Sequence, residues 1–175
     1  MEAQAIPLVY ELIQQYKPRT YCEIGVHNGL SAAGIIKEMF KYQMSVKFVG
    51  YDAFEPVGKA EHNGKSDAGE QHYIKCCQRM QGIQKVNNLD WQLIKGFTTD
   101  TLKPQRFDFA YIDGGHSYET VNHDYSMLKR SNIILFDDYN LREVKCAVDE
   151  IVLGYQLPYT TPNGKKKKWV IINEN

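Results

Sequence analysis

The chain has 175 residues, of which 43% are hydrophobic and 24% are charged. This composition suits one globular domain with a sizeable core, and no linker or low-complexity tract divides the sequence. Lysine plus arginine and aspartate plus glutamate both total 21, so no net charge draws the protein toward nucleic acid or a membrane. We therefore expect a single domain over residues 1–175.

The sequence carries no sign of membrane insertion or export. No apolar run approaches the roughly 20 residues of a membrane span, and the first residues lack the basic segment and apolar core of a signal peptide. The four cysteines, Cys22, Cys76, Cys77 and Cys146, have no spacing typical of zinc, so we expect reduced thiols. These features predict a cytoplasmic protein.

Hydrophobic periodicity divides the chain into alternating helices and strands. Apolar residues at helical spacing predict an opening helix within residues 1–18, and the β-rich run TYCEI follows, before a second helix that ends near Phe40. Further strands are expected at 46–52, 91–96, 107–113 and 132–138, with helices at 72–81, 118–128 and 144–151. This alternation favours a parallel sheet with helices on both faces.

The end of the chain breaks the alternation. The runs YQLPYTT and KKKKWVII flank the turn Asn163-Gly164, which predicts an antiparallel hairpin over residues 155–172. We interpret Lys165–Lys168 as a solvated face that protects a sheet edge, with contact to an acidic or phosphorylated substrate as the alternative. The expected fold class is α/β: a doubly wound, Rossmann-like, mostly parallel sheet closed by a C-terminal antiparallel hairpin.

A glycine-containing turn after the first strand is the first candidate site. In CEIGVHNGLSA, Glu23, Gly25 and Gly29 form the pattern E-x-G-x-x-x-G, and Ser31 is placed to cap the following helix. Glycines let the backbone approach a ligand closely, and a helix start offers N–H groups. The fingerprint G-x-G-x-x-G is absent, so a dinucleotide pyrophosphate is not favoured. An ordinary tight turn is the alternative.

An acidic residue, Asp52, ends the second strand. A carboxylate there, beside the glycine turn, is placed to accept both hydroxyls of a ribose. A loop acid or a helix cap is the alternative. Together with the glycine turn, Asp52 predicts one nucleoside site at the point where the strand order reverses.

The most unusual stretch is FDFAYIDGGHSYETVNHDYSML, in which an apolar strand ends in Asp113 and leads through two glycines to His116. Asp137 and Asp138 end the next strand, so we expect three carboxylates at the edge of the sheet where ligands bind. Three carboxylates without a cysteine suit a hard cation such as Mg²⁺. The alternatives are structural, because Asp-Gly is a common turn and an aspartate can cap a helix.

These motifs together resemble the class I S-adenosylmethionine-dependent methyltransferases. The E-x-G-x-x-x-G turn, the acid after the second strand and the final hairpin carry the resemblance from about Thr20 to Ile172. Within that class, IDGGHSYE followed by ILFDDY is similar to the branch that includes the metal-dependent sugar O-methyltransferases of macrolide biosynthesis. The resemblance implies S-adenosylmethionine as the cofactor.

The resemblance also implies which residues bind that cofactor. The implied set is Glu23, Gly25, Gly29, Asp52 and Asp113. Within it, Glu23 and Gly25 are expected at the methionine end and Asp52 at the ribose.

For the chemistry, the resemblance implies that Asp113, Asp137 and Asp138 bind a metal, expected to be Mg²⁺, and that His116 is the general base, with Asp113 also in the catalytic group. An alcohol is a weak nucleophile near neutral pH, and a bound metal stabilises the alkoxide as it forms. A histidine can take the proton. The predicted function is Mg²⁺-assisted O-methylation of a hydroxyl on a sugar or other small molecule.

Other functions stay open at this point. The chain is alternatively a cofactor-binding or assembly protein without methyl transfer, or another metal-dependent transferase or hydrolase. We expect a small-molecule acceptor, no nucleic-acid or membrane partner, and a monomer or homodimer. The sequence identifies neither the acceptor nor whether its reacting atom is oxygen or nitrogen.

The surroundings of the predicted site are less defined. The polar loop from Phe54 to Asp67 leaves the same edge, so we expect either a lid that orders on binding or a plain surface loop. Four aromatic residues near strand ends, Phe54, Phe97, Tyr118 and Tyr139, are candidates to line the pocket, with a place in the core as the alternative.

Overall fold

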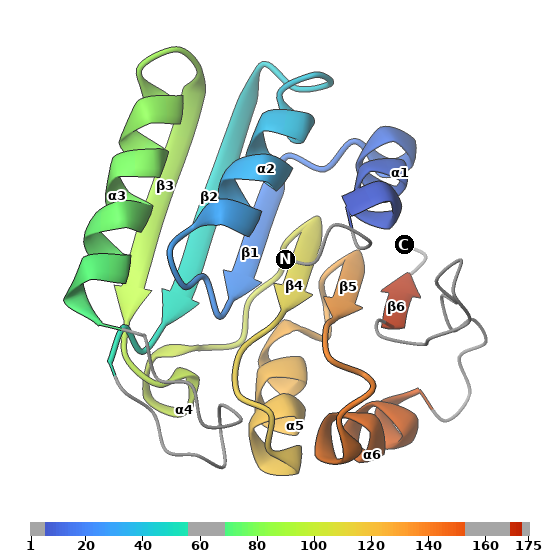
Figure 1. The fold of residues 1–175 in the computed structure, drawn as a ribbon. Coiled ribbons are helices and arrows are strands. Elements are labelled where there is room, and N and C mark those ends of the chain that lie inside the picture. Colours follow the sequence, from blue (N-terminus) through green and yellow to red (C-terminus); the bar gives the residue numbers. More distant parts are fainter. Residues whose placement is uncertain (1–5, 56–68, 153–168, 173–175) are drawn as a thin grey trace.

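The computed structural model describes residues 6–55, 69–152 and 169–172, along which helices and strands alternate (Figure 1). The strands are β1 (Thr20–Ile24), β2 (Ser45–Asp52), β3 (Asn88–Lys95), β4 (Phe109–Ile112), β5 (Ile133–Phe136) and β6 (Trp169–Ile172). The helices are α1 (Ile6–Tyr16), α2 (Leu30–Met39), α3 (Glu70–Gln84), α4 (Thr98–Thr101), α5 (Tyr118–Leu128) and α6 (Arg142–Ile151).

The described strands form one sheet in the order β3-β2-β1-β4-β5-β6. The first five in this order are parallel, and β6 runs antiparallel to β5. The chain moves outward from β1 to β3 and then returns to the other side of β1 at β4, so the strand order reverses between β1 and β4. Ligands bind at the carboxyl ends of the strands beside such a reversal. The predicted doubly wound, mostly parallel α/β sheet is confirmed.

Only the last strand of the predicted C-terminal hairpin is described. In it, Trp169 of β6 pairs with Phe136 of β5. The first arm of the hairpin, the turn and Lys165–Lys168 lie outside the described residues, as do residues 56–67 of the loop that we expect as a lid or a plain surface loop.

Helices cover both faces of the sheet and enclose two hydrophobic clusters. Alternate residues of β4 divide between them: Phe109 and Tyr111 belong to the cluster under α1, α2 and α3, whereas Ala110 and Ile112 belong to the cluster under α5 and α6. All residues of β4 and β5 are buried, as expected for central parallel strands. These two apolar layers fix the sheet, and its carboxyl edge presents the polar residues that follow each strand.

Two local features differ from the sequence prediction. Ser31 does not cap α2, because Gly29 occupies the N-cap position with φ +77° and no side-chain cap. The Ser31 hydroxyl donates instead to the carboxylate of Glu23, a buried acceptor that needs a donor. Helix α4 is not indicated by the sequence pattern, because TTDT has no apolar residue to give a helical period.

The cysteines agree with the expectation of reduced thiols. Cys22, Cys76, Cys77 and Cys146 are all free. No helix among the described residues combines the length and apolarity that a membrane crossing requires.

Gly29→Ala and Gly82→Ala are expected to change stability in opposite directions. A Cβ at Gly29 would lie 2.6 Å from the Cys76 sulfur on a backbone with positive φ, so we expect a loss of about 1–3 kcal/mol. A Cβ at Gly82, inside α3, meets nothing within 4 Å, so alanine should stabilise by about 0.5–1 kcal/mol. Urea unfolding of both variants checks this, and effects of the same sign would contradict it.

Candidate active site

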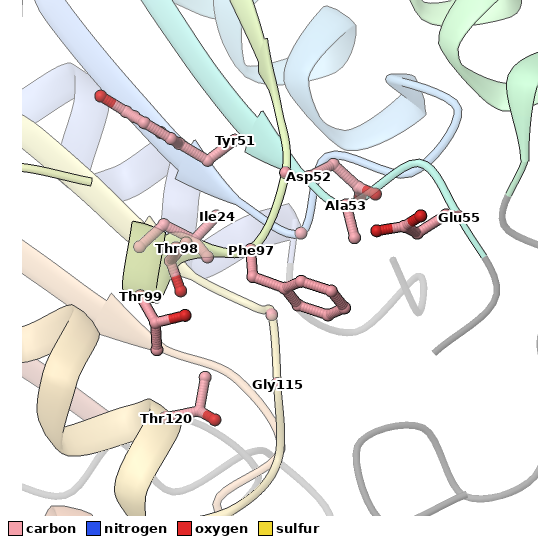
Figure 2. Close-up of a pocket in the computed structure, with 13 residues that line it drawn as sticks. Ile24, Tyr51, Asp52, Ala53, Glu55, Phe97, Thr98, Thr99, Gly115 and Thr120 are labelled. Atoms are coloured by element: carbon pink, nitrogen blue, oxygen red, sulfur yellow. The ribbon is translucent and has the colours of Figure 1, made fainter. Parts of the chain in front are cut away.

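A cavity of about 230 Å³ opens at the carboxyl edge of the sheet, beside the reversal of strand order (Figure 2). Its walls come from the turns after β1 and β4, the end of β2, the segment that leads into α4, and Thr120 of α5. Four separate connections therefore meet around one hollow, at the place where this class of sheet binds ligands.

Asp52 stands at the wall of this cavity with its carboxylate fixed by the backbone. Oδ2 accepts the N–H of His27, and Oδ1 accepts the N–H of Phe54, both at 2.7 Å. Each oxygen retains acceptor capacity for a ligand. Figure 2 shows Asp52 and Glu55 on one side of the Phe97 ring, with Thr99 and Thr120 on the other.

Glycines form the floor of the cavity between the turns after β1 and β4. Gly25 has φ +83°, and a Cβ there would lie 1.9 Å from the backbone oxygen of Asp113. A Cβ at Gly114 would lie 2.7 Å from the Ile24 side chain. The two turns thus pack backbone against backbone, which leaves room for a ligand where side chains would stand.

Glu23, predicted at the methionine end of the cofactor, lies fully buried behind this floor and does not line the cavity. Its two oxygens accept hydrogen bonds from the hydroxyls of Ser31 and Tyr21. Burial raises the pKa of Glu23 from 4.5 to about 7, although these two hydrogen bonds oppose the rise. Gly29 also lies away from the cavity, against Cys76.

The predicted catalytic residues gather in a second, smaller hollow that shares Gly114 and Gly115 with the cavity. It is lined by Asp113, His116, Asp137 and Asp138, together with apolar residues of β4, β5, α5 and α6. His116 Nε2 lies 3.1 Å from Asp138 Oδ2. The structure therefore brings the four predicted residues together and pairs the histidine with one carboxylate.

These carboxylates do not form a metal cage in their present arrangement. Within the described residues, no group of three or more His, Cys, Asp or Glu side chains is placed to hold one metal ion. Both oxygens of Asp137 accept hydrogen bonds, from the Tyr111 hydroxyl and from the N–H of Asp138. The assignment of Asp113, Asp137 and Asp138 to Mg²⁺ stays a prediction.

Several residues at the cavity carry no sequence motif. The segment from Gly96 to Thr99 forms one wall, and His123 of α5 holds it through a contact of 3.1 Å between Nε2 and the Thr98 oxygen. Only the position of the segment from Gly96 to Thr99 could have indicated a site, because it follows β3 at the same edge of the sheet as the other turns. Glu55 and Thr120 also line the cavity.

The aromatic candidates divide between cavity and core. Phe97 lines the cavity and is 46% exposed. Phe54 and Tyr139 are buried, and Tyr118 packs against the hydrophobic cluster under α5 and α6. Of these four candidates, Phe97 is therefore the one that offers an aromatic face to a ligand in this cavity.

Sequence comparison matches most of this region. A family model described as a methyltransferase domain matches residues 22–139. An uncharacterized protein of Acanthamoeba polyphaga mimivirus is 26% identical in an alignment 151 residues long that covers 82% of this chain and 63% of the relative. The chain thus spans less than two thirds of that relative's length.

Solved structures share the fold. The O-methyltransferase NovP has a TM-score of 0.68 at 15% identity, over 98% of this chain and 80% of that one. An O-methyltransferase from Bacillus cereus, solved in complex with SAH, has a TM-score of 0.67 at 14% identity, over 99% and 82%. TomG from Streptomyces achromogenes, an O-methyltransferase of tomaymycin synthesis in complex with SAM, has a TM-score of 0.66 at 14% identity, over 99% of this chain and 82% of that one.

The buried Glu23 predicts a pH-dependent stability. Its pKa is raised from 4.5 to about 7 by burial, so the folded state holds the proton more tightly and stability falls as pH rises across that window, by about 3 kcal/mol in all. Glu23→Gln lacks this titration. Urea unfolding from about pH 4.5 to about pH 8 should show that the free energy of unfolding of the variant increases relative to that of wild type as pH rises. A constant difference between the two proteins would contradict the assignment.

Proposed function

The chain belongs to the methyltransferase-domain family, and on that premise we propose that it transfers a methyl group from S-adenosylmethionine to a hydroxyl of a small molecule. The observation that carries the proposal is the cavity of about 230 Å³ at the reversal of strand order, with Asp52 at its wall. Similar folds solved with SAH and SAM support this choice of cofactor.

The residues of the cavity fit this cofactor. The fixed carboxylate of Asp52 accepts the ribose hydroxyls, since its oxygens have lone pairs beyond those used by the backbone. The ring of Phe97 offers a flat apolar face for the adenine. The glycine floor at Gly25 and Gly114 lets the remainder of the cofactor pass close to the backbone. When bound, S-adenosylmethionine supplies an electrophilic methyl group on a sulfonium.

His116 is the proposed base for the acceptor. The imidazole of His116 would take the proton of the acceptor hydroxyl, and S-adenosylmethionine, held by Asp52 and the glycine floor, would supply the methyl group and keep the electron pair of the C–S bond on its sulfur. Asp138, 3.1 Å from Nε2, orients the ring and stabilises the positive charge that forms on it. Gly114 and Gly115 line both hollows, so the proposed cofactor side and the base adjoin at these two glycines.

Magnesium has no step in this proposal. The sequence resemblance implies a metal, but Asp137 and Asp138 are engaged by Tyr111 and His116 in the arrangement described above. The acids contribute here as hydrogen-bond and ion-pair partners, and metal dependence is left to experiment.

Asp52→Asn should weaken binding of S-adenosylmethionine by about 10- to 100-fold, because it removes a charged acceptor worth about 1.5–3 kcal/mol. Calorimetric titration of the cofactor into wild type and variant measures this. Asp90→Asn is the matched control, since Asp90 is an exposed aspartate of the neighbouring strand β3 and does not line the cavity. Equal affinity in all three proteins would show that Asp52 does not hold the ribose.

Turnover is expected only with hydroxylated acceptors and should fall by about 10²- to 10⁴-fold in His116→Gln, the usual contribution of a general base. Formation of SAH in the presence of a panel of sugars, phenols and amines measures it, with Mg²⁺ and with EDTA. Turnover lost in EDTA and restored by Mg²⁺ would support the metal implied by the sequence. Cofactor binding without turnover on any acceptor would favour a cofactor-binding protein.

A further inference from the structure

We propose that Tyr111, a buried residue of β4, positions the proposed base His116 through a chain of contacts. Tyr111 fixes the carboxylate of Asp137, and Asp137 stabilises the backbone turn at Asp138. The side chain of Asp138 then orients His116. The inference depends on the proposed role of His116 as base. It assigns to Tyr111 no contact with cofactor or acceptor, so Tyr111 is a positioning residue.

The first link is the hydrogen bond from the Tyr111 hydroxyl to Asp137 Oδ2. Tyr111 is completely buried, in the same hydrophobic cluster as its register partner Leu135 of β5. The hydroxyl is therefore held in the core, where it donates to the carboxylate of Asp137.

The second link is the other oxygen of Asp137. Oδ1 accepts the N–H of Asp138 at 2.8 Å, and the N–H of Asp137 itself donates to the Ile112 oxygen at 3.0 Å. The carboxylate is thus divided between a fixed donor in the core and the backbone of the turn. Rotation of this carboxylate would break both hydrogen bonds, so the Tyr111 hydroxyl restrains the turn as well as the side chain.

The third link is the backbone of Asp138. Its φ is +50°, a left-handed conformation that an aspartate adopts at a cost and that its surroundings must stabilise. The Asp138 oxygen also accepts the N–H of Leu141 at 2.8 Å, at the start of α6. The direction of the Asp138 side chain therefore depends on a strained turn that Asp137 holds from one side and α6 from the other.

The last link is the contact of 3.1 Å between Asp138 Oδ2 and His116 Nε2. His116 follows Gly114 and Gly115, whose backbones impose little direction of their own. The side chain of His116 is 17% exposed and that of Asp138 is 40% exposed, so the pair sits at the surface of the hollow. A change in the backbone at Asp138 would let its carboxylate move to solvent and away from the imidazole of His116.

Tyr21 provides a matched control on the adjacent strand. It is also completely buried, and its hydroxyl donates to the carboxylate of Glu23. Glu23 is the register partner of Tyr111 between β1 and β4. Both bonds thus run from a buried tyrosine hydroxyl to a carboxylate, but the bond of Tyr21 leads to Ser31 and α2 rather than to the turn at Asp138.

The experiment follows the ring nitrogens of His116 by ¹H–¹⁵N NMR at one fixed, mildly alkaline pH, with His116→Gln to identify its signals among the five histidines. Asp138→Asn defines the displacement caused by loss of the orienting carboxylate. Tyr111→Phe is expected to displace the His116 signals in the same direction, while calorimetry shows unchanged binding of S-adenosylmethionine. Tyr21→Phe is expected to leave the His116 signals in place.

The proposal is overturned if the His116 signals of Tyr111→Phe coincide with wild type while Asp138→Asn moves them, or if Tyr21→Phe moves them equally. If Tyr111→Phe does not fold, Asp137→Ala removes the acceptor of the same bond and must displace the signals in its place. Failure of the proposed function is a separate result: wild type would then bind no S-adenosylmethionine, whatever the His116 signals show.

Discussion

The site depends on one close approach, in which the turns after β1 and β4 lie backbone against backbone. The approach requires glycine at position 25, because a Cβ on Gly25 would lie 1.9 Å from the Asp113 oxygen. Hydrogen bonds from Asp113 to the Ile24 oxygen, at 2.9 Å, and from Gly25 to the Tyr51 oxygen, at 2.8 Å, tie these turns to each other and to β2. The cavity is the space left above this junction, so its position follows from the strand order, and its floor from the absence of side chains.

A second constraint is the number of acids at this edge, each of which needs compensation because an ionised carboxylate loses hydration when buried. The degree of burial decides the kind of partner. Glu23, fully buried, receives two hydroxyl donors and still has a raised pKa. Asp52, partly exposed, receives two backbone N–H groups, and Asp138 contacts a histidine that carries charge only when protonated. The acids therefore divide into a buried structural group and an accessible group that can meet a ligand.

The sheet could be predicted from the sequence because buried parallel strands are continuous apolar runs and the acids follow them directly. The positions of Asp52 and Asp113 could be predicted in the same way, since the carboxyl ends of parallel strands lie at one edge of the sheet. Glu23 is buried and does not line the cavity, because the period of two along β1 puts it on the face of Tyr21, under α2. Its contact with the cofactor stays a prediction. The pairing of His116 with Asp138 depends on a left-handed backbone angle and on a hydrogen bond from another strand. Neither leaves a pattern in the local sequence.

The two hollows are the basis for the proposed combination of cofactor binding and base chemistry in one small domain. They share Gly114 and Gly115, and His116 lines the smaller one. The rigid part of this arrangement is the core: Tyr111 lies in the sheet, and its hydroxyl reaches the acid that follows β5. The accessible part is the turn at Asp138, which has to hold an unfavourable conformation at the surface. In this proposal the strained turn is linked to the buried hydroxyl of Tyr111, which restrains Asp138, the residue that contacts His116.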